Sequence, residues 1–118
     1  MPPQGTGSDI TRQDANDLLQ RLITEAIKVQ AVFIGRSVAA KTIGVASRPE
    51  NDVIGVTEGK VATDSSLSFG LTEVVGFKYG DSRSFPGLTP KPGAPRFASA
   101  LCFVYPDGAQ VILFEIAP

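Results

Sequence analysis

The feature that most constrains this fold is a pair of apolar segments, residues 96–105 and 110–116, joined by Pro106-Asp107-Gly108. Proline, aspartate and glycine in that order suit a short hairpin loop with glycine at a positive φ, so we predict an antiparallel hairpin. Successive side chains of a strand point to opposite faces. In the first segment both faces are apolar. One face carries Phe97, Leu101, Phe103 and Tyr105, and the other carries Ala98, Ala100, Cys102 and Val104.

Two apolar faces require two covers, because an antiparallel strand with one face in water alternates apolar and polar residues. A single helix can shelter only one face. The sequence favours a second copy of the chain as the other cover, in a homodimer that uses the first face as its interface. Two alternatives stay open: cover by the loop 81–95, and closure of the sheet into a monomeric barrel with the helix as a lid.

One amphipathic helix is predicted over residues 11–29. Thr11 and Asp14 form an N-terminal capping pattern. Apolar residues then recur at helical spacing along one side of the segment. These residues are Ala15, Leu18, Leu19, Leu22, Ile23, Ala26 and Ile27.

Beyond the helix, the sequence has the short apolar runs and turn residues of a β-sheet. Residues 36–42 suit either a strand or one helical turn, and Arg48 to Asp52 predict a turn. Gly70 and Gly76 suggest bends within a long β-type segment. The predicted strand segments are 31–34, 43–46, 53–56, 60–63, 67–79, 96–105 and 110–116.

The predicted fold class is α+β: one N-terminal amphipathic helix packed on an antiparallel sheet, or partly closed barrel, of about five to seven strands. Residues 1–8 are rich in proline and glycine and are predicted to be disordered. Residues 9–118 are predicted to form a single domain, because a chain of 118 residues is typical of one domain.

The charge balance argues against nucleic acid as a partner. Eleven basic and 12 acidic residues are scattered along the chain, whereas nucleic-acid binding usually shows a basic excess. The first residues lack the basic and apolar stretches of a signal peptide. No apolar run approaches the ~20 residues that span a bilayer. We therefore expect a cytoplasmic protein with no membrane partner.

The sequence contains no histidine and one cysteine. It therefore lacks the commonest general base, the usual activator of a nucleophile and the ligands of a standard zinc site. Cys102 lies in an apolar run and is expected to be a buried small hydrophobe. The segment from Gly55 to Val61 differs from a phosphate-binding loop in its glycine spacing and in its last residue. We expect no metal and no cofactor.

The loop 80–96 is the predicted ligand site. It contains four prolines and is longer than most connections in a compact domain, which is typical of binding loops or of solvated connectors. In the binding interpretation, basic side chains contact a small anionic or polar ligand beside an apolar wall. The candidate residues are Tyr79, Asp81, Arg83, Phe85, Lys91 and Arg96.

These observations favour a non-enzymatic, homodimeric binding module. The first alternative is a small enzyme with Glu73 or Asp81 as base and Arg83 or Arg96 stabilising charge, which requires a carboxylate inside a closed cavity. Glu115, like Glu73, is flanked by apolar residues and is expected to face solvent or to pair with a cation. The weaker alternative is a small-barrel RNA-binding protein.

Overall fold

A computed structural model describes residues 8–35, 39–50, 52–57, 66–85 and 96–117. Over these residues the chain forms one helix and one eight-stranded sheet. The predicted combination of a helix with an antiparallel sheet is confirmed, and the number of strands exceeds the predicted five to seven. The elements are β1 (Ser8–Ile10), α1 (Arg12–Thr24), β2 (Lys28–Ile34), β3 (Ala39–Glu50), β4 (Val53–Thr57), β5 (Ser66–Gly70), β6 (Gly76–Asp81), the 3-10 turn η1 (Ser82–Ser84), β7 (Phe97–Val104) and β8 (Gln110–Ile116).

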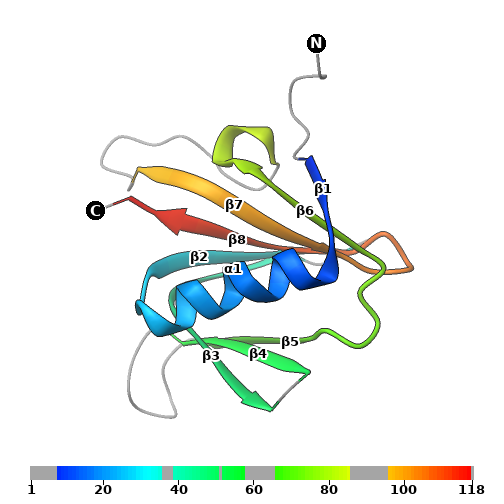
Figure 1. The fold of residues 1–118 in the computed structure, drawn as a ribbon, viewed down its shortest axis with the longest axis horizontal. Helices are drawn as coiled ribbons and strands as arrows, with labels where there is room; N and C mark the ends of the chain where they lie inside the picture. Colours follow the sequence, from blue (N-terminus) through cyan, green and yellow to red (C-terminus); the bar gives the residue numbers. More distant parts are fainter. Residues whose placement is uncertain (1–7, 36–38, 51, 58–65, 86–95, 118) are drawn as a thin grey trace.

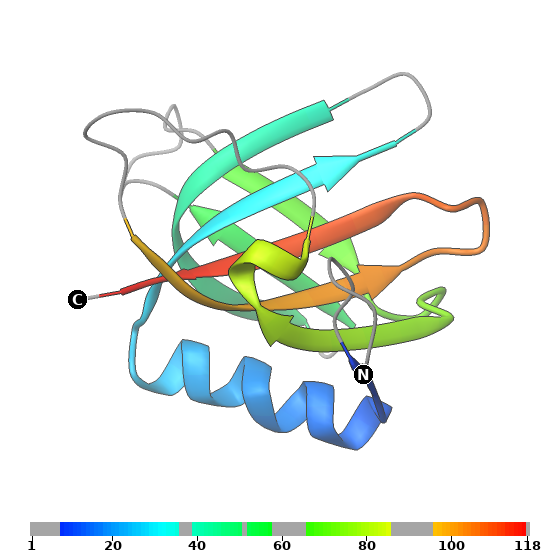
Figure 2. The same cartoon turned by 90° about the horizontal axis from the view of Figure 1, so that it is seen from above.

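The strands follow the order β1-β6-β7-β8-β2-β3-β4-β5, and each neighbouring pair is antiparallel. The sheet is strongly curved, with β1 at one edge and β5 at the other (Figure 1). The described strands do not close into a barrel. Helix α1 lies across one face of the curved sheet (Figure 2).

Helix α1 begins as predicted and ends early. The hydroxyl of Thr11 accepts the backbone N–H of Asp14 at 3.1 Å, which caps the first turn. The helix ends at Thr24, and Ala26 adopts a left-handed φ of 50°. The prediction that the helix reaches residue 29 is therefore wrong. Residues from Lys28 onward form a central strand between β3 and β8, where they gain two sets of main-chain hydrogen bonds.

Several sequence-predicted boundaries also shift. Residues 39–50 form one long strand with a register shift between Ser47 and Glu50. The turn predicted over Arg48 to Asp52 is confirmed only at its end, where the chain reverses between the paired residues Glu50 and Val53. The segment 67–79 divides into β5 and β6 around a turn at 71–75. Ser8 is the first residue of β1 and pairs with Tyr79. Residues 1–7, 36–38 and 60–63 lie outside the described residues.

The two apolar faces of the C-terminal hairpin are both buried. The first core cluster lies between α1 and the sheet and includes Leu101, Phe103, Val111 and Leu113. The second lies on the opposite face and consists of Val32, Ala100, Cys102, Ile112 and Phe114, each at most 1% exposed in the single chain. Phe85 and Phe97 pack against this second cluster.

The predicted division of side chains between the faces is wrong at Phe97. A register shift between Phe97 and Ala100 interrupts the alternation of β7. The Phe97 ring therefore packs on the second cluster, with its centroid 5.9 Å from that of Phe114. Leu101 and Phe103 belong to the core below α1 and are 2% and 0% exposed. The residues predicted as a dimer interface are thus divided between the two faces of the sheet. Leu101 and Phe103 lie in the interior of the single chain.

Candidate functional site

The residues predicted to form a ligand site do not gather in one place. Tyr79 is half-buried against the first core cluster, whereas Phe85 packs on the second, across the sheet. They therefore do not form one apolar wall. Arg96 is exposed just before β7, and Lys91 lies outside the described residues.

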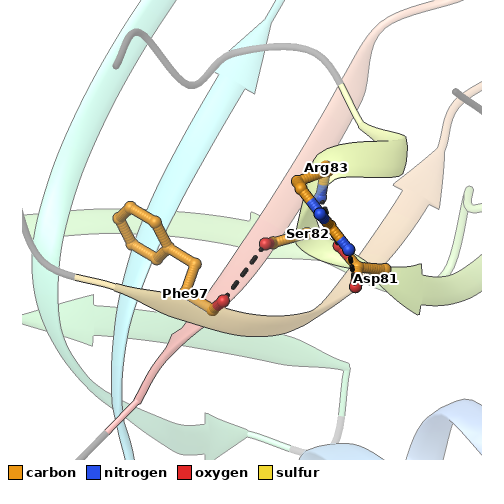
Figure 3. Close-up of polar contacts among 4 residues, drawn as sticks. All are labelled: Asp81, Ser82, Arg83 and Phe97. Atoms are coloured by element: carbon orange, nitrogen blue, oxygen red, sulfur yellow. Dashed lines mark hydrogen bonds and ion pairs between the residues drawn. The ribbon is translucent and has the colours of Figure 1, made fainter. Parts of the chain in front are cut away.

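Asp81 and Arg83 form a local pair at the end of β6. The Asp81 carboxylate accepts the backbone N–H of Arg83 at 2.9 Å and its side-chain Nε at 3.1 Å (Figure 3). The side-chain hydrogen bond from Arg83, and then the backbone one, lower the pKa of Asp81. Ser82 is buried and donates its hydroxyl to the Phe97 carbonyl at 3.3 Å. The Ser82 hydrogen bond fixes η1 to β7, and the Asp81–Arg83 contacts stay within the turn itself, so all of them have a structural explanation.

The carboxylates considered as bases do not lie in a closed cavity. Asp81 and Glu73 are exposed, and a lowered pKa makes Asp81 a weaker base. Glu115 forms two hydrogen bonds with the Arg21 guanidinium, at 2.8 and 3.3 Å, which link β8 to α1. This hydrogen bonding is the main reason that the pKa of Arg21 is raised. The geometry therefore gives no support to carboxylate acid–base catalysis.

A cleft of about 390 Å³ opens between edge strand β5 and the turn that joins β7 to β8. Its size is within the range of small-ligand sites. Apolar side chains from β2, β5, β8 and the turn line it, and polar groups stand among them. The lining residues are Phe33, Leu67, Ser68, Phe69, Gly70, Glu73, Tyr105, Pro106, Asp107, Ala109 and Val111.

The two charged residues that line the cleft in the described part of the chain are both acidic. Asp107 is held in the turn, where its carboxylate accepts the Ala109 N–H at 3.0 Å. Glu73 lies on the 71–75 turn, which Arg12 anchors by donating to the carbonyls of Leu71 and Val74 at 3.2 and 3.1 Å. Within the described ranges of the chain, no lysine or arginine lines the cleft. The cleft thus combines an apolar interior with an acidic rim, which we call the acidic cleft.

Tyr105 connects the two sides of the acidic cleft. Its hydroxyl donates to the Gly70 carbonyl at 2.6 Å and so ties the β7–β8 turn to β5. Burial, and to a smaller extent the negative charge of Glu73, raise the pKa of Tyr105 to about 12. The hydroxyl therefore stays protonated, and keeps its hydrogen bond, across the neutral pH range.

We expect Tyr105→Phe to lower the free energy of unfolding by about 1 kcal/mol at pH 7, because the hydrogen bond to Gly70 is lost. The pKa of Tyr105 is higher in the folded chain than the ordinary value of 10. Its contribution is therefore complete below pH 10 and is lost as the pH rises toward 12. Urea unfolding between pH 7 and pH 11.5 measures both effects. Tyr79→Phe is the control, and parallel pH profiles for wild type and Tyr105→Phe would contradict the assignment.

Sequence reasoning named Tyr105 as an interface residue and Glu73 as a candidate base, but it did not join them into this site. It treated Asp107 only as a turn residue. The signal that was available is the acidic turn between two apolar strands. The sequence did not indicate that β5 lies beside this turn, and the cleft forms only where that strand curves toward it.

The described residues contain no group of three side chains suited to hold a metal ion. In the part of the chain that the structure describes, no helix is long and apolar enough to cross a membrane. Comparison of the sequence with known protein families finds no matching family, and searches of curated proteins and of solved structures find no match.

Proposed function

We propose that this chain is a non-enzymatic binding module, that its site is the acidic cleft, and that its ligand has an apolar body and a positive charge. The observation that carries the proposal is the pairing of an apolar interior with Glu73 and Asp107 in a cleft that, among the residues the structure describes, no basic side chain lines. An apolar ligand gains free energy by leaving water, at roughly 25 cal/mol per Å² of buried surface. A cationic group adds attraction to the rim and makes binding selective for charge.

This proposal differs from the sequence-based hypothesis in the location of the site and in the charge of the ligand. That hypothesis put an anionic or polar ligand beside Arg83, Lys91 and Arg96. In the structure Arg83 is paired with Asp81. The acidic cleft would repel an anion, so the proposed ligand has the opposite sign.

The test uses phenethylamine, which joins an aromatic ring to an ammonium group, and 3-phenylpropionate, an anion of similar size. We expect phenethylamine to shift the NMR signals of Phe33, Tyr105 and Val111 and 3-phenylpropionate to leave them in place. Glu73→Gln combined with Asp107→Asn should weaken phenethylamine binding about three- to tenfold, as expected for two exposed charges.

The matched control removes two exposed carboxylates away from the cleft, by Asp9→Asn and Glu25→Gln. This double variant carries the same change in net charge and should bind phenethylamine like the wild type. Equal binding of the anion, or equal losses in the two double variants, would overturn the proposal.

Self-association stays a prediction, carried over from the sequence. Its interface would have to exclude Leu101 and Phe103, because both are interior. Light scattering tests it directly: a particle with the mass of two chains would support the homodimer, and a particle with the mass of one chain would contradict it.

A further inference from the structure

We infer that the occupant of the acidic cleft is an extended peptide segment of a partner protein, which adds as a further strand to the free edge of β5 and places a lysine or arginine side chain at the acidic rim. This inference rests on the proposed function, because it identifies the apolar and cationic ligand as a peptide. It is drawn from the main-chain geometry of β5, a different observation from the charge of the cleft.

The hydrogen-bonding direction of β5 follows from its register with β4. Pairing joins Ile54 to Phe69 and Gly55 to Ser68. The Leu71 N–H donates to the Asp52 carbonyl at 2.7 Å, which extends the same register by one bonded pair. In an antiparallel pair, bonded positions alternate with unbonded ones. The main chain of Phe69 therefore bonds to β4, whereas the N–H and carbonyl of Ser68 point away from it.

The hydrogen bond made by Tyr105 gives independent support for this direction. Gly70 is two residues from Ser68, so its carbonyl points the same way. That carbonyl accepts the Tyr105 hydroxyl, which lies on the opposite side of the cleft. The free edge of β5 therefore faces the cleft, and Tyr105 closes one end of it. Within the described residues, no loop or side chain bonds to the main chain of Ser68.

An unpaired strand edge is ready to pair with another chain unless something blocks it. The other edge of this sheet, β1, has only three residues, and a charged Asp9 at its centre. Strand β5 has neither a charge nor a proline in its sequence Ser-Leu-Ser-Phe-Gly. Of the two edges, β5 is the one that can accept a strand.

A strand beside β5 would match the chemistry of the cleft. Its alternate side chains would enter the cleft over Leu67, Phe69 and Phe33, which favours apolar residues. At the end where β5 meets the turns, it would pass Glu73 and Asp107, which favours a basic residue. Strand addition of this kind takes affinity from main-chain hydrogen bonds and selectivity from pockets for alternate side chains.

The test uses two capped pentapeptides of alternating valine and threonine, with arginine at the C-terminal position in one and at the N-terminal position in the other. With both peptides, the arginine can reach the acidic rim whether the added strand runs parallel or antiparallel to β5. We expect one of them to bind, and hydrogen exchange at the Ser68 amide to slow at least about tenfold at saturation. Replacing its arginine with glutamate should weaken binding about tenfold.

Two changes test the main-chain contact itself. Ser68→Pro removes the N–H that points away from β4 and should weaken peptide binding about tenfold, whereas Ser68→Ala keeps that N–H and should not. N-methylation of the peptide amide that donates to the Ser68 carbonyl should have a similar effect without any change in the protein. The N-methylated peptide therefore tests the main-chain contact even if the Ser68→Pro variant fails to fold.

The inference is overturned if neither peptide binds, if saturation leaves exchange at Ser68 unchanged, or if peptides N-methylated at each position bind like the parent. Phenethylamine separates these results from the proposed function. If its charge-dependent binding persists in any of these cases, the acidic cleft binds cations but does not accept a strand. If that binding is also absent, the proposed function has failed.

Discussion

Phe103→Ala is expected to lower the free energy of unfolding by about 3–5 kcal/mol, as measured by urea denaturation. The Phe103 side chain is 0% exposed. Its ring centroid lies 5.0 Å from that of Phe69 and 5.8 Å from that of Phe77, so it joins β7 to both β5 and β6. Alanine would leave a cavity where these three strands meet. A loss of this size is a large part of the 5–15 kcal/mol that typically stabilises a domain.

Val75→Ala provides the control for this substitution, because Val75 is 66% exposed. It should change the free energy of unfolding by no more than about 0.5 kcal/mol. Phe103→Leu, which keeps most of the apolar volume, should lie between the two. A loss below about 1 kcal/mol for Phe103→Ala would show that this ring is not central to the core.

Phe114→Ala is expected to cost a similar amount, about 3–5 kcal/mol, on the opposite face of the sheet. Phe114 is 0% exposed and contacts the Phe97 ring in the second core cluster. Because this burial occurs within a single chain, the loss should not depend on protein concentration. Urea unfolding at two concentrations about a hundredfold apart measures this.

The same experiment bears on self-association. If a second copy of the chain stabilised this face, the free energy of unfolding would rise with protein concentration and the effect of Phe114→Ala would change with it. Ile112→Val, a smaller truncation in the same cluster, should cost about 0.5–1.5 kcal/mol at either concentration. A concentration-dependent loss would contradict the single-chain explanation.

The sequence by itself determined the elements that depend on near neighbours. Thr11 caps the helix because its hydroxyl reaches a backbone N–H three residues away. Pro106-Asp107-Gly108 turns the hairpin because Gly108 can adopt a φ of 90°. The alternation within residues 100–104 and 110–114 placed apolar side chains on both faces, and both faces are buried. Each of these outcomes follows from local geometry.

The tertiary structure decided whatever depends on competition between distant partners. Ala26 and Ile27 fit a helical spacing, but they lie in the turn after α1, because the residues from Lys28 onward pair with β3 and β8. A register shift placed Phe97 on the face opposite to the one that simple alternation gives. The candidate site unites Phe33, the β5 region and the β7–β8 turn. These segments are far apart in the chain and meet only because the sheet curves, and no local pattern encodes that curvature or the acidic charge gathered there.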